Sequence, residues 1–150
     1  MARTASILLV EDDANDALLV RMAFQRTRSG IPLIIVPNGV EAVDYLKGNG
    51  PYKDRQKYPF PDILLLDLKL PEMSGLEVLR WIRADPNYKR LPVIVLTNSV
   101  QDNDARQAYE AGANSYVIKP TDFNQLVETV QNLGDFWLEG TKLPDVGPHH

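Results

Sequence analysis

Carboxylates, a hydroxyl and an ammonium each follow a short apolar run in this sequence of 150 residues. Side chains of these kinds accept, contact or neutralise phosphoryl groups. Glu11, Asp12 and Asp13 follow residues 7–10, Asp67 follows 63–66, Thr97 follows 93–96, and Lys119 follows 116–118. If the four runs are parallel strands of one sheet, their carboxyl ends open on the edge where open α/β sheets bind ligands. The sequence therefore predicts one shared site for these side chains.

Asp67 is the strongest candidate for a covalent role. A carboxylate can attack a phosphoryl group to give an aspartyl phosphate. The donor is anionic, and like charges ~4 Å apart repel by roughly 4 kcal/mol at an effective dielectric of 20. A divalent cation removes this cost, and a site of carboxylates, a carbonyl and water suits Mg²⁺. The alternative interpretation is that Asp67 only caps the turn after its strand.

The acidic residues after the first run also have two interpretations. Acidic residues are favoured just before a helix, and we expect Asp13 to cap a helix that begins near Ala14. Taken alone, the triplet is explained better by capping than by metal binding.

Thr97 and Lys119 extend the candidate site beyond carboxylates. A β-branched residue such as Thr97 is an ordinary strand former, although its hydroxyl could donate to a phosphoryl oxygen. Lys119 is more informative, because a lysine is rarely buried unless it is paired. Its ammonium could pair with Asp67 in the empty site and with the phosphoryl group in the loaded one.

Strand-like and helix-like segments alternate along the chain, as in a parallel sheet built from βα units. Strands are expected over 6–10, 33–36, 62–66, 92–97 and 115–118. Helices are expected over 14–28, 40–47, 75–84, 102–111 and 122–138. This pattern predicts an α/β, flavodoxin-like, doubly wound five-stranded parallel sheet with five helices and strand order 2-1-3-4-5.

Length and composition predict one domain over residues 1–139 and a disordered Pro- and Gly-rich tail over 140–150. The formal net charge of −4 argues against a nucleic-acid partner. The absence of cysteine excludes disulfides and thiolate metal sites. No apolar run approaches the ~20 residues that cross a bilayer, and the N-terminus lacks a secretory signal. We therefore expect a cytoplasmic protein with no membrane partner.

Over about residues 5–138 the sequence resembles the receiver domains of two-component response regulators. The resemblance rests on the acidic pair after the first run, Asp67 with Pro71 and Gly75 downstream, Thr97, residues 112–116, and Lys119-Pro120. It implies a CheY-like fold and transfer of a phosphoryl group from a histidine kinase to Asp67. It also implies that Mg²⁺ is held by Glu11, Asp12, Asp67 and the backbone carbonyl of Lys69, with Asp13 as the reserve ligand should the register shift by one residue.

The resemblance further implies a conformational switch and a cis Lys119–Pro120 peptide bond. On phosphorylation, Thr97 moves toward the phosphoryl group and Tyr116 swings inward. Receivers catalyse their own phosphorylation and dephosphorylation but turn over no free substrate, so an enzyme is not expected.

Two positions depart from the family pattern. Asn98 stands where a small residue is usual, and its side chain could crowd the phosphoryl group or hydrogen-bond to it. Lys69 places a positive charge at the mouth of the site, with Ser99 opposite, and we hypothesise that it shields the acyl phosphate from water.

A narrower resemblance links the chain to the single-domain regulators that partner bacterial and cyanobacterial phytochromes. It rests on the long connection over 48–61 and on residues 136–138. No output domain follows the last helix, so output is expected through a downstream protein or phosphotransfer partner. Phe136 lies off the apolar stripe of that helix, and we expect a homodimer that uses the Phe136-Trp137 segment. The expected dimer surface also includes the side formed by the helices over 102–111 and 122–138, and the alternative is that the tail folds back and buries Phe136 in the same chain. Separately, the basic and aromatic residues over 52–60 fit kinase docking or local packing better than nucleic-acid binding.

Three other functions compete with a phosphoacceptor. A haloacid-dehalogenase-type phosphatase needs a second aspartate where Lys69 stands. A flavin-binding protein needs a Ser-, Thr- or Gly-rich phosphate loop where the acidic triplet stands. A pseudo-receiver would keep the fold as a protein-binding module without phosphorylation.

Overall fold

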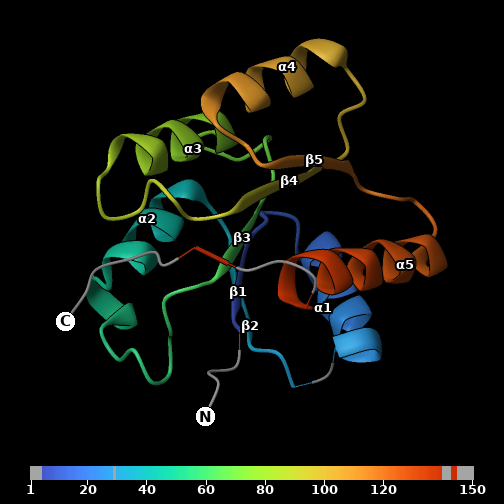
Figure 1. Cartoon of the computed structure of the whole chain (residues 1–150), viewed down its shortest axis with the longest axis horizontal. Coiled ribbons are helices and arrows are strands. Elements are labelled where there is room, and N and C mark those ends of the chain that lie inside the picture. Colours follow the sequence, from blue (N-terminus) through green and yellow to red (C-terminus); the bar gives the residue numbers. More distant parts are fainter. Residues whose placement is uncertain (1–4, 29, 140–142, 145–150) are drawn as a thin grey trace.

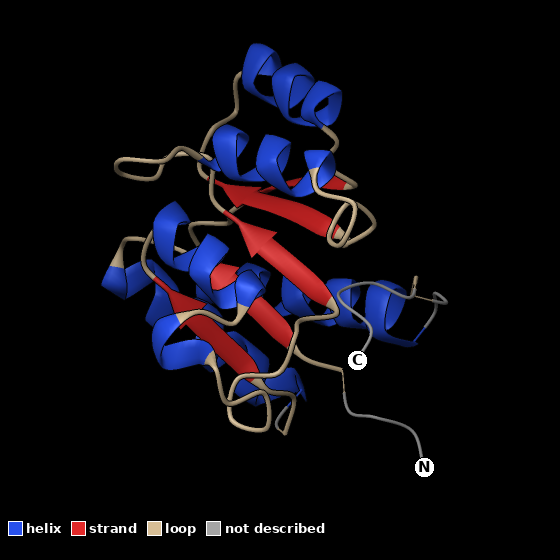
Figure 2. Ribbon diagram, turned by 90° about the vertical axis from the view of Figure 1, so that its left-hand side faces the viewer, coloured by secondary structure: helices blue, strands red, loops and turns tan. Residues whose placement is uncertain are grey.

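The strands of this chain form one parallel sheet in the order β2-β1-β3-β4-β5, as the sequence predicts. In the computed structural model, which describes residues 5–28, 30–139 and 143–144, the sheet lies between two layers of helices (Figures 1 and 2). The strands are β1 (Ile7–Val10), β2 (Leu33–Val36), β3 (Ile63–Leu66), β4 (Val93–Thr97) and β5 (Ser115–Ile118). The helices are α1 (Ala14–Arg28), α2 (Gly39–Lys47), α3 (Gly75–Ala84), α4 (Asp102–Ala111) and α5 (Phe123–Leu133).

The helices cover both faces of the sheet, which explains why its central strands are apolar throughout. α1 and α5 pack together on one face, and α2, α3 and α4 cover the other (Figure 1). All residues of β1, β3 and β4 are buried, whereas β5 at the edge is only half covered. Two apolar cores result, one on each side of the sheet.

Polar caps and left-handed glycines set several helix ends. Asn38 and Ser74 accept N–H hydrogen bonds at the starts of α2 and α3, at 2.8 and 3.2 Å. Gly48 and Gly112 end α2 and α4 with φ of 72° and 110°, a region that favours glycine. Apart from the last helix, every predicted element matches the structure to within one residue.

The predicted helix over 122–138 is wrong in its second half. α5 ends at Leu133, and a π-helical segment continues over Gly134–Glu139. The wider π turn changes the direction of the following side chains. Trp137 and Leu138 both pack against the α1–α5 core as a result.

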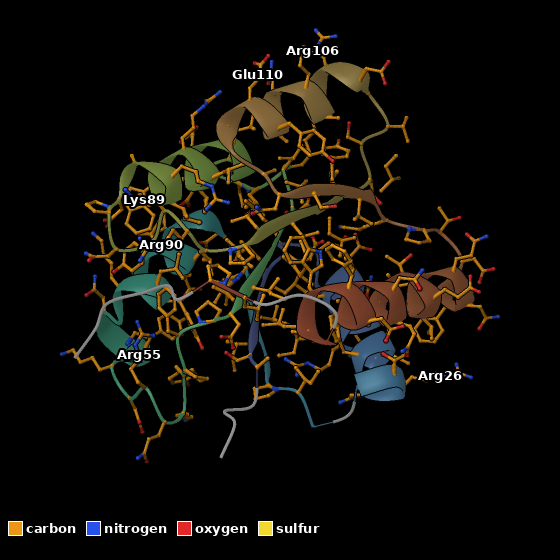
Figure 3. All side chains as sticks on the ribbon, viewed as in Figure 1. Arg26, Arg55, Lys89, Arg90, Arg106 and Glu110 are labelled. Atoms are coloured by element: carbon orange, nitrogen blue, oxygen red, sulfur yellow. The ribbon has the colours of Figure 1, made fainter. Side chains whose placement is uncertain are left out.

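The long connection over 48–61 is built by local packing, one of the two alternatives expected for it. The Arg55 guanidinium donates to the carbonyl oxygens of Tyr45, Leu46 and Tyr58 at 2.8, 2.8 and 3.2 Å, and it lies beside α2 (Figure 3). The rings of Tyr45, Tyr52 and Tyr58 contact one another. The aromatic residues of the connection therefore fold onto α2.

The structure corrects one expectation and leaves another outside its described residues. No described peptide bond is cis, so the expected cis Lys119–Pro120 bond is wrong, and the bond has the trans form that X–Pro peptides generally favour. Most of the tail predicted to be disordered, residues 140–142 and 145–150, lies outside the described residues. Leu143 is described, and it packs against the α1–α5 core. Across the described part of the chain, each helix is too short or too polar to cross a membrane.

Candidate functional site

Glu11, Asp67 and Lys119 each lie one residue beyond a strand and extend its hydrogen-bonded ladder. Their N–H groups donate to carbonyls of neighbouring strands, at 3.0, 3.2 and 2.7 Å respectively. Because the strands are parallel, all three residues reach the same edge of the sheet. The structure therefore brings the predicted residues together.

The Lys119 ammonium is the centre of this site. It donates to Oε1 of Glu11 in a very short contact, to Oδ2 of Asp16 at 3.1 Å and to Oδ2 of Asp67 at 3.2 Å. The side chains of Lys119, Glu11 and Asp67 are only 7%, 1% and 8% exposed, whereas Asp16 is 33% exposed. Three carboxylates thus share one buried ammonium.

Burial and charge shift the pKa values of the two most buried groups. Burial raises the pKa of Glu11 to about 7, against the hydrogen bond from Lys119, which favours the ionised carboxylate. Burial alone would lower the pKa of Lys119, but its contacts with Glu11 and Asp67 outweigh it and raise that pKa. Three carboxylates are therefore balanced by one ammonium among these contacts.

The carboxylates have the composition of a site for a hard divalent cation. Glu11, Asp12 and Asp67 each offer one oxygen, and these oxygens lie within 4.8 Å of one another. Oxygen ligands of this kind suit Mg²⁺ and Mn²⁺. Two of the residues are buried and Asp12 is exposed, so the cluster is open to solvent on one side. The residues therefore fit the metal that the sequence predicts, while the part expected of the Lys69 carbonyl stays a prediction.

Asp13 caps α1, as expected, and takes no part in this oxygen cluster. Its Oδ1 accepts from the N–H groups of Asn15 and Asp16 at 2.8 and 3.0 Å. The cap fixes the first turn of α1, which carries Asp16 to Lys119. Asp16 is a site residue that the sequence does not reveal, because the helix dipole is the ordinary explanation for an acidic residue in the first turn of a helix.

Thr97 connects the site to the loop between β4 and α4. Thr97 is fully buried, and its hydroxyl accepts from the N–H of Ser99 at 3.4 Å. The carbonyl of Ser99 in turn accepts from the hydroxyl of Tyr116 at 3.0 Å. Asn98 is exposed and lines an open cavity of about 210 Å³ together with Asp16 and Lys119. Asn98 thus shares this cavity with Lys119 and Asp16.

Lys69 and Gly75 shape the loop that follows Asp67. The Lys69 side chain is 74% exposed, and its ammonium lies 3.8 Å from Oδ2 of Asp104, which also accepts from the Ser99 hydroxyl. The Lys69 N–H donates to Oδ1 of Asp67 at 3.2 Å. A Cβ at Gly75 would lie 2.7 Å from the Cα of Leu68 and closer still to the Asp67 carbonyl oxygen. α3 therefore starts directly against the backbone of the candidate phosphoacceptor.

The two predicted interface residues in the segment after α5 differ in exposure. Phe136 is 59% exposed, and Trp137 is half-buried against the α1–α5 core. Their rings meet edge to face at 5.2 Å between centroids. Phe136 is therefore exposed on this segment, while the tail that the alternative would fold over it lies, apart from residues 143–144, outside the described residues.

A parallel five-stranded sheet with this acidic edge defines the receiver class, and comparison with known proteins agrees. The response regulator receiver domain model matches residues 7–131, so the chain belongs to that family. Members of this family are generally signalling proteins.

The most informative relatives are phytochrome response regulators. The response regulator Rcp1 of Synechocystis sp. is 39% identical, with 92% of each chain covered. The phosphorylated cyanobacterial phytochrome response regulator RcpA superposes with a TM-score of 0.87 at 36% identity, covering 95% of this chain and 100% of that one. The Mn²⁺-bound form of Rcp1 superposes with a TM-score of 0.83 at 38% identity, covering 94% and 99%. The narrower resemblance expected from the sequence is confirmed.

Proposed function

We propose that this protein accepts a phosphoryl group on Asp67 from a histidine kinase of the phytochrome class, and signals through phosphorylation-dependent protein contacts. The observation that supports this most strongly is the buried ammonium of Lys119 shared between Asp67 and Glu11. Such an ammonium can turn to a phosphoryl group once one is attached to Asp67. The similarity to the phosphorylated form of RcpA supports the same chemistry.

Transfer from a phosphohistidine needs one bond made and one broken. An Asp67 carboxylate oxygen attacks phosphorus, and the P–N bond to the donor imidazole breaks with its electron pair leaving on nitrogen. Lys119 and the Thr97 hydroxyl contact the phosphoryl oxygens, which carry the developing charge. Mg²⁺ held by Glu11, Asp12 and Asp67 would supply further neutralisation of that charge.

Thr97 and Tyr116 provide a path from the site to the surface. The Thr97 hydroxyl accepts a hydrogen bond from the Ser99 N–H. When the hydroxyl turns toward the phosphoryl group, this hydrogen bond is broken. Ser99 also holds the Tyr116 hydroxyl through its carbonyl, so movement of this loop repositions Tyr116 on β5. Phosphorylation thereby changes the conformation of the surface formed by α4, β5 and α5, and a downstream partner can recognise this change.

The same surface is suited to a second copy of the chain. β5 is the edge strand of the sheet, and Tyr109, Ile118 and Phe136 are 52%, 46% and 59% exposed. Arg106 and Glu110 point outward from α4 (Figure 3). A two-fold axis can place Arg106 of one protomer opposite Glu110 of its partner, around an apolar centre. This supports the homodimer expected from the sequence.

The phosphorylation proposal is tested with acetyl phosphate and Mg²⁺, followed by intact mass. One added phosphoryl group, absent with Asp67→Asn and without metal, is the expected result. No gain in mass would instead support the pseudo-receiver alternative. A phosphorylated histidine kinase from a phytochrome then replaces acetyl phosphate as the donor.

The dimer is tested separately by sedimentation. Phe136→Ser is expected to give a monomer under conditions in which the parent is a dimer. Val40→Ser is the matched control, because Val40 is 47% exposed on α2, on the other face of the sheet. A monomeric parent, or a dimeric Phe136→Ser, contradicts the proposed interface.

A further inference from the structure

Asp16 is a partner of Lys119 that lies outside the oxygen cluster suited to a metal. Its Oδ2 is 3.1 Å from the Lys119 ammonium. The cluster of closely spaced oxygens consists of Glu11, Asp12 and Asp67. Of the three carboxylates on Lys119, two are therefore also candidate metal ligands and Asp16 is not.

The position of Asp16 is fixed by the structure around it. Its N–H donates to the capping carboxylate of Asp13 at 3.0 Å, which holds the first turn of α1. Its side chain is 33% exposed, whereas Glu11 is 1% exposed. The Asp16 carboxylate thus lies on the solvent side of Lys119.

A divalent cation and the Lys119 ammonium compete for the same oxygens. Lys119 contacts Glu11 and Asp67, and a cation bound there takes over their negative charge and repels the ammonium. The ammonium is buried and still needs a carboxylate partner. Asp16 is a partner that the cation leaves free.

We propose that Asp16 is a positioning residue that retains the Lys119 ammonium when Glu11 and Asp67 bind a divalent cation. This role rests on the proposed phosphoacceptor function and adds a residue to it. In the empty site Lys119 is shared by three carboxylates. In the metal-loaded site Asp16 keeps it beside Asp67, ready for the incoming phosphoryl group. Asp16 therefore lowers the cost of metal binding and prepares the site for transfer.

The test is a double-mutant cycle on Mn²⁺ affinity, measured by titration with the metal alone. Asp16→Asn is expected to weaken Mn²⁺ binding about tenfold, the lower end of the usual cost of losing an outer-shell partner. In a Lys119→Met background the same change is expected to have less than a twofold effect, since no ammonium is left to compete. Lys119→Gln is a second background with the same expectation.

Two controls separate positioning from a simple loss of charge. Asp102→Asn removes an exposed carboxylate in the first turn of α4 and is expected to leave Mn²⁺ affinity unchanged. Asp16→Glu restores a carboxylate and is expected to recover most of the affinity. Equal weakening by Asp16→Asn with and without Lys119 overturns the proposal, and so does an unchanged affinity in the parent background. The titration contains Mn²⁺ and no phosphoryl donor. A parent protein that fails to become phosphorylated therefore contradicts the proposed function without deciding the outcome of this test.

Discussion

The two edges of the sheet are each organised by one long cationic side chain, but the partners differ. At the carboxyl edge, Lys119 contacts the carboxylates of Glu11, Asp16 and Asp67. At the amino edge, Arg83 of α3 donates to backbone carbonyls and to the Asn114 side chain, at 2.7 to 2.9 Å. Burial lowers the pKa of Arg83, yet guanidinium remains charged in proteins.

The hydrogen bonds around Arg83 form a fixed junction, whereas the ion pairs around Lys119 can exchange partners. The carbonyls around Arg83 are neutral and held by the backbone at the starts of β4 and β5, so no other ion competes for them. The carboxylates around Lys119 are charged, and they can exchange the ammonium for a metal or a proton. The amino edge therefore contributes stability, and the carboxyl edge retains the capacity to react.

Lys119→Met should have the largest effect, on phosphorylation. The rate with acetyl phosphate and Mg²⁺ should fall about 100-fold, because a buried donor to the phosphoryl oxygens is lost. The time course of intact mass measures this rate. A rate within threefold of the parent would show that Lys119 is no more than a structural partner of the carboxylates.

Arg83→Ala should have the opposite profile. The unfolding free energy should fall by about 3 kcal/mol, since several charge-assisted hydrogen bonds are lost from a half-buried junction. Urea denaturation measures the change, and phosphorylation well below the unfolding transition should match the parent. Arg80→Ala, an exposed position on the same helix, is the control and should change stability by less than about 0.5 kcal/mol.

Glu11→Gln should remove a pH dependence of stability in the metal-free protein. The pKa of Glu11 is about 7 in the folded chain against an ordinary value of 4.5, so between these values the folded state holds more protons. Stability from this group is therefore present at low pH and is lost as pH rises through 7. From pH 5 to pH 8 the parent should lose on the order of 2 kcal/mol relative to Glu11→Gln. Parallel stability curves for the two proteins would contradict this.

Lys69→Ala should have the smallest effect, on the lifetime of the acyl phosphate. If Lys69 shields the acyl phosphate from water, hydrolysis should be a few-fold faster in the variant, equivalent to about 0.7 kcal/mol. The decay of phosphorylated mass after removal of the donor gives the rate. Asp104→Asn frees Lys69 from its salt bridge and is the companion variant. An unchanged rate in Lys69→Ala rules the shielding role out.

The order of elements and the convergence of Glu11, Asp67 and Lys119 could be predicted from sequence. The information lies in apolar runs of strand length, each followed by a polar residue. Because the carboxyl ends of parallel strands meet at one edge of the sheet, these polar residues must lie at that edge. The burial of the central strands could also be predicted, because strands of a sheet covered on both faces are apolar throughout and do not alternate apolar with polar residues.

The role of Asp16 and the end of α5 could not be predicted in the same way. Asp16 meets Lys119, more than one hundred positions away, only after α1 has packed against α5, and its local pattern is that of any first helical turn. The π turn after Leu133 accompanies the packing of Trp137 and Leu138 against the α1–α5 core. Both features are set by tertiary packing, which a one-dimensional pattern does not encode.

The close packing of Gly75 has a consequence for protein engineering. Because α3 begins against the backbone of Asp67 and Leu68, any side chain at position 75 displaces the phosphoacceptor itself. Loops exchanged between receivers should therefore keep glycine at this junction. Lys69 is exposed in the same loop, so variants at this position can test its proposed effect on the lifetime of the acyl phosphate without altering the junction.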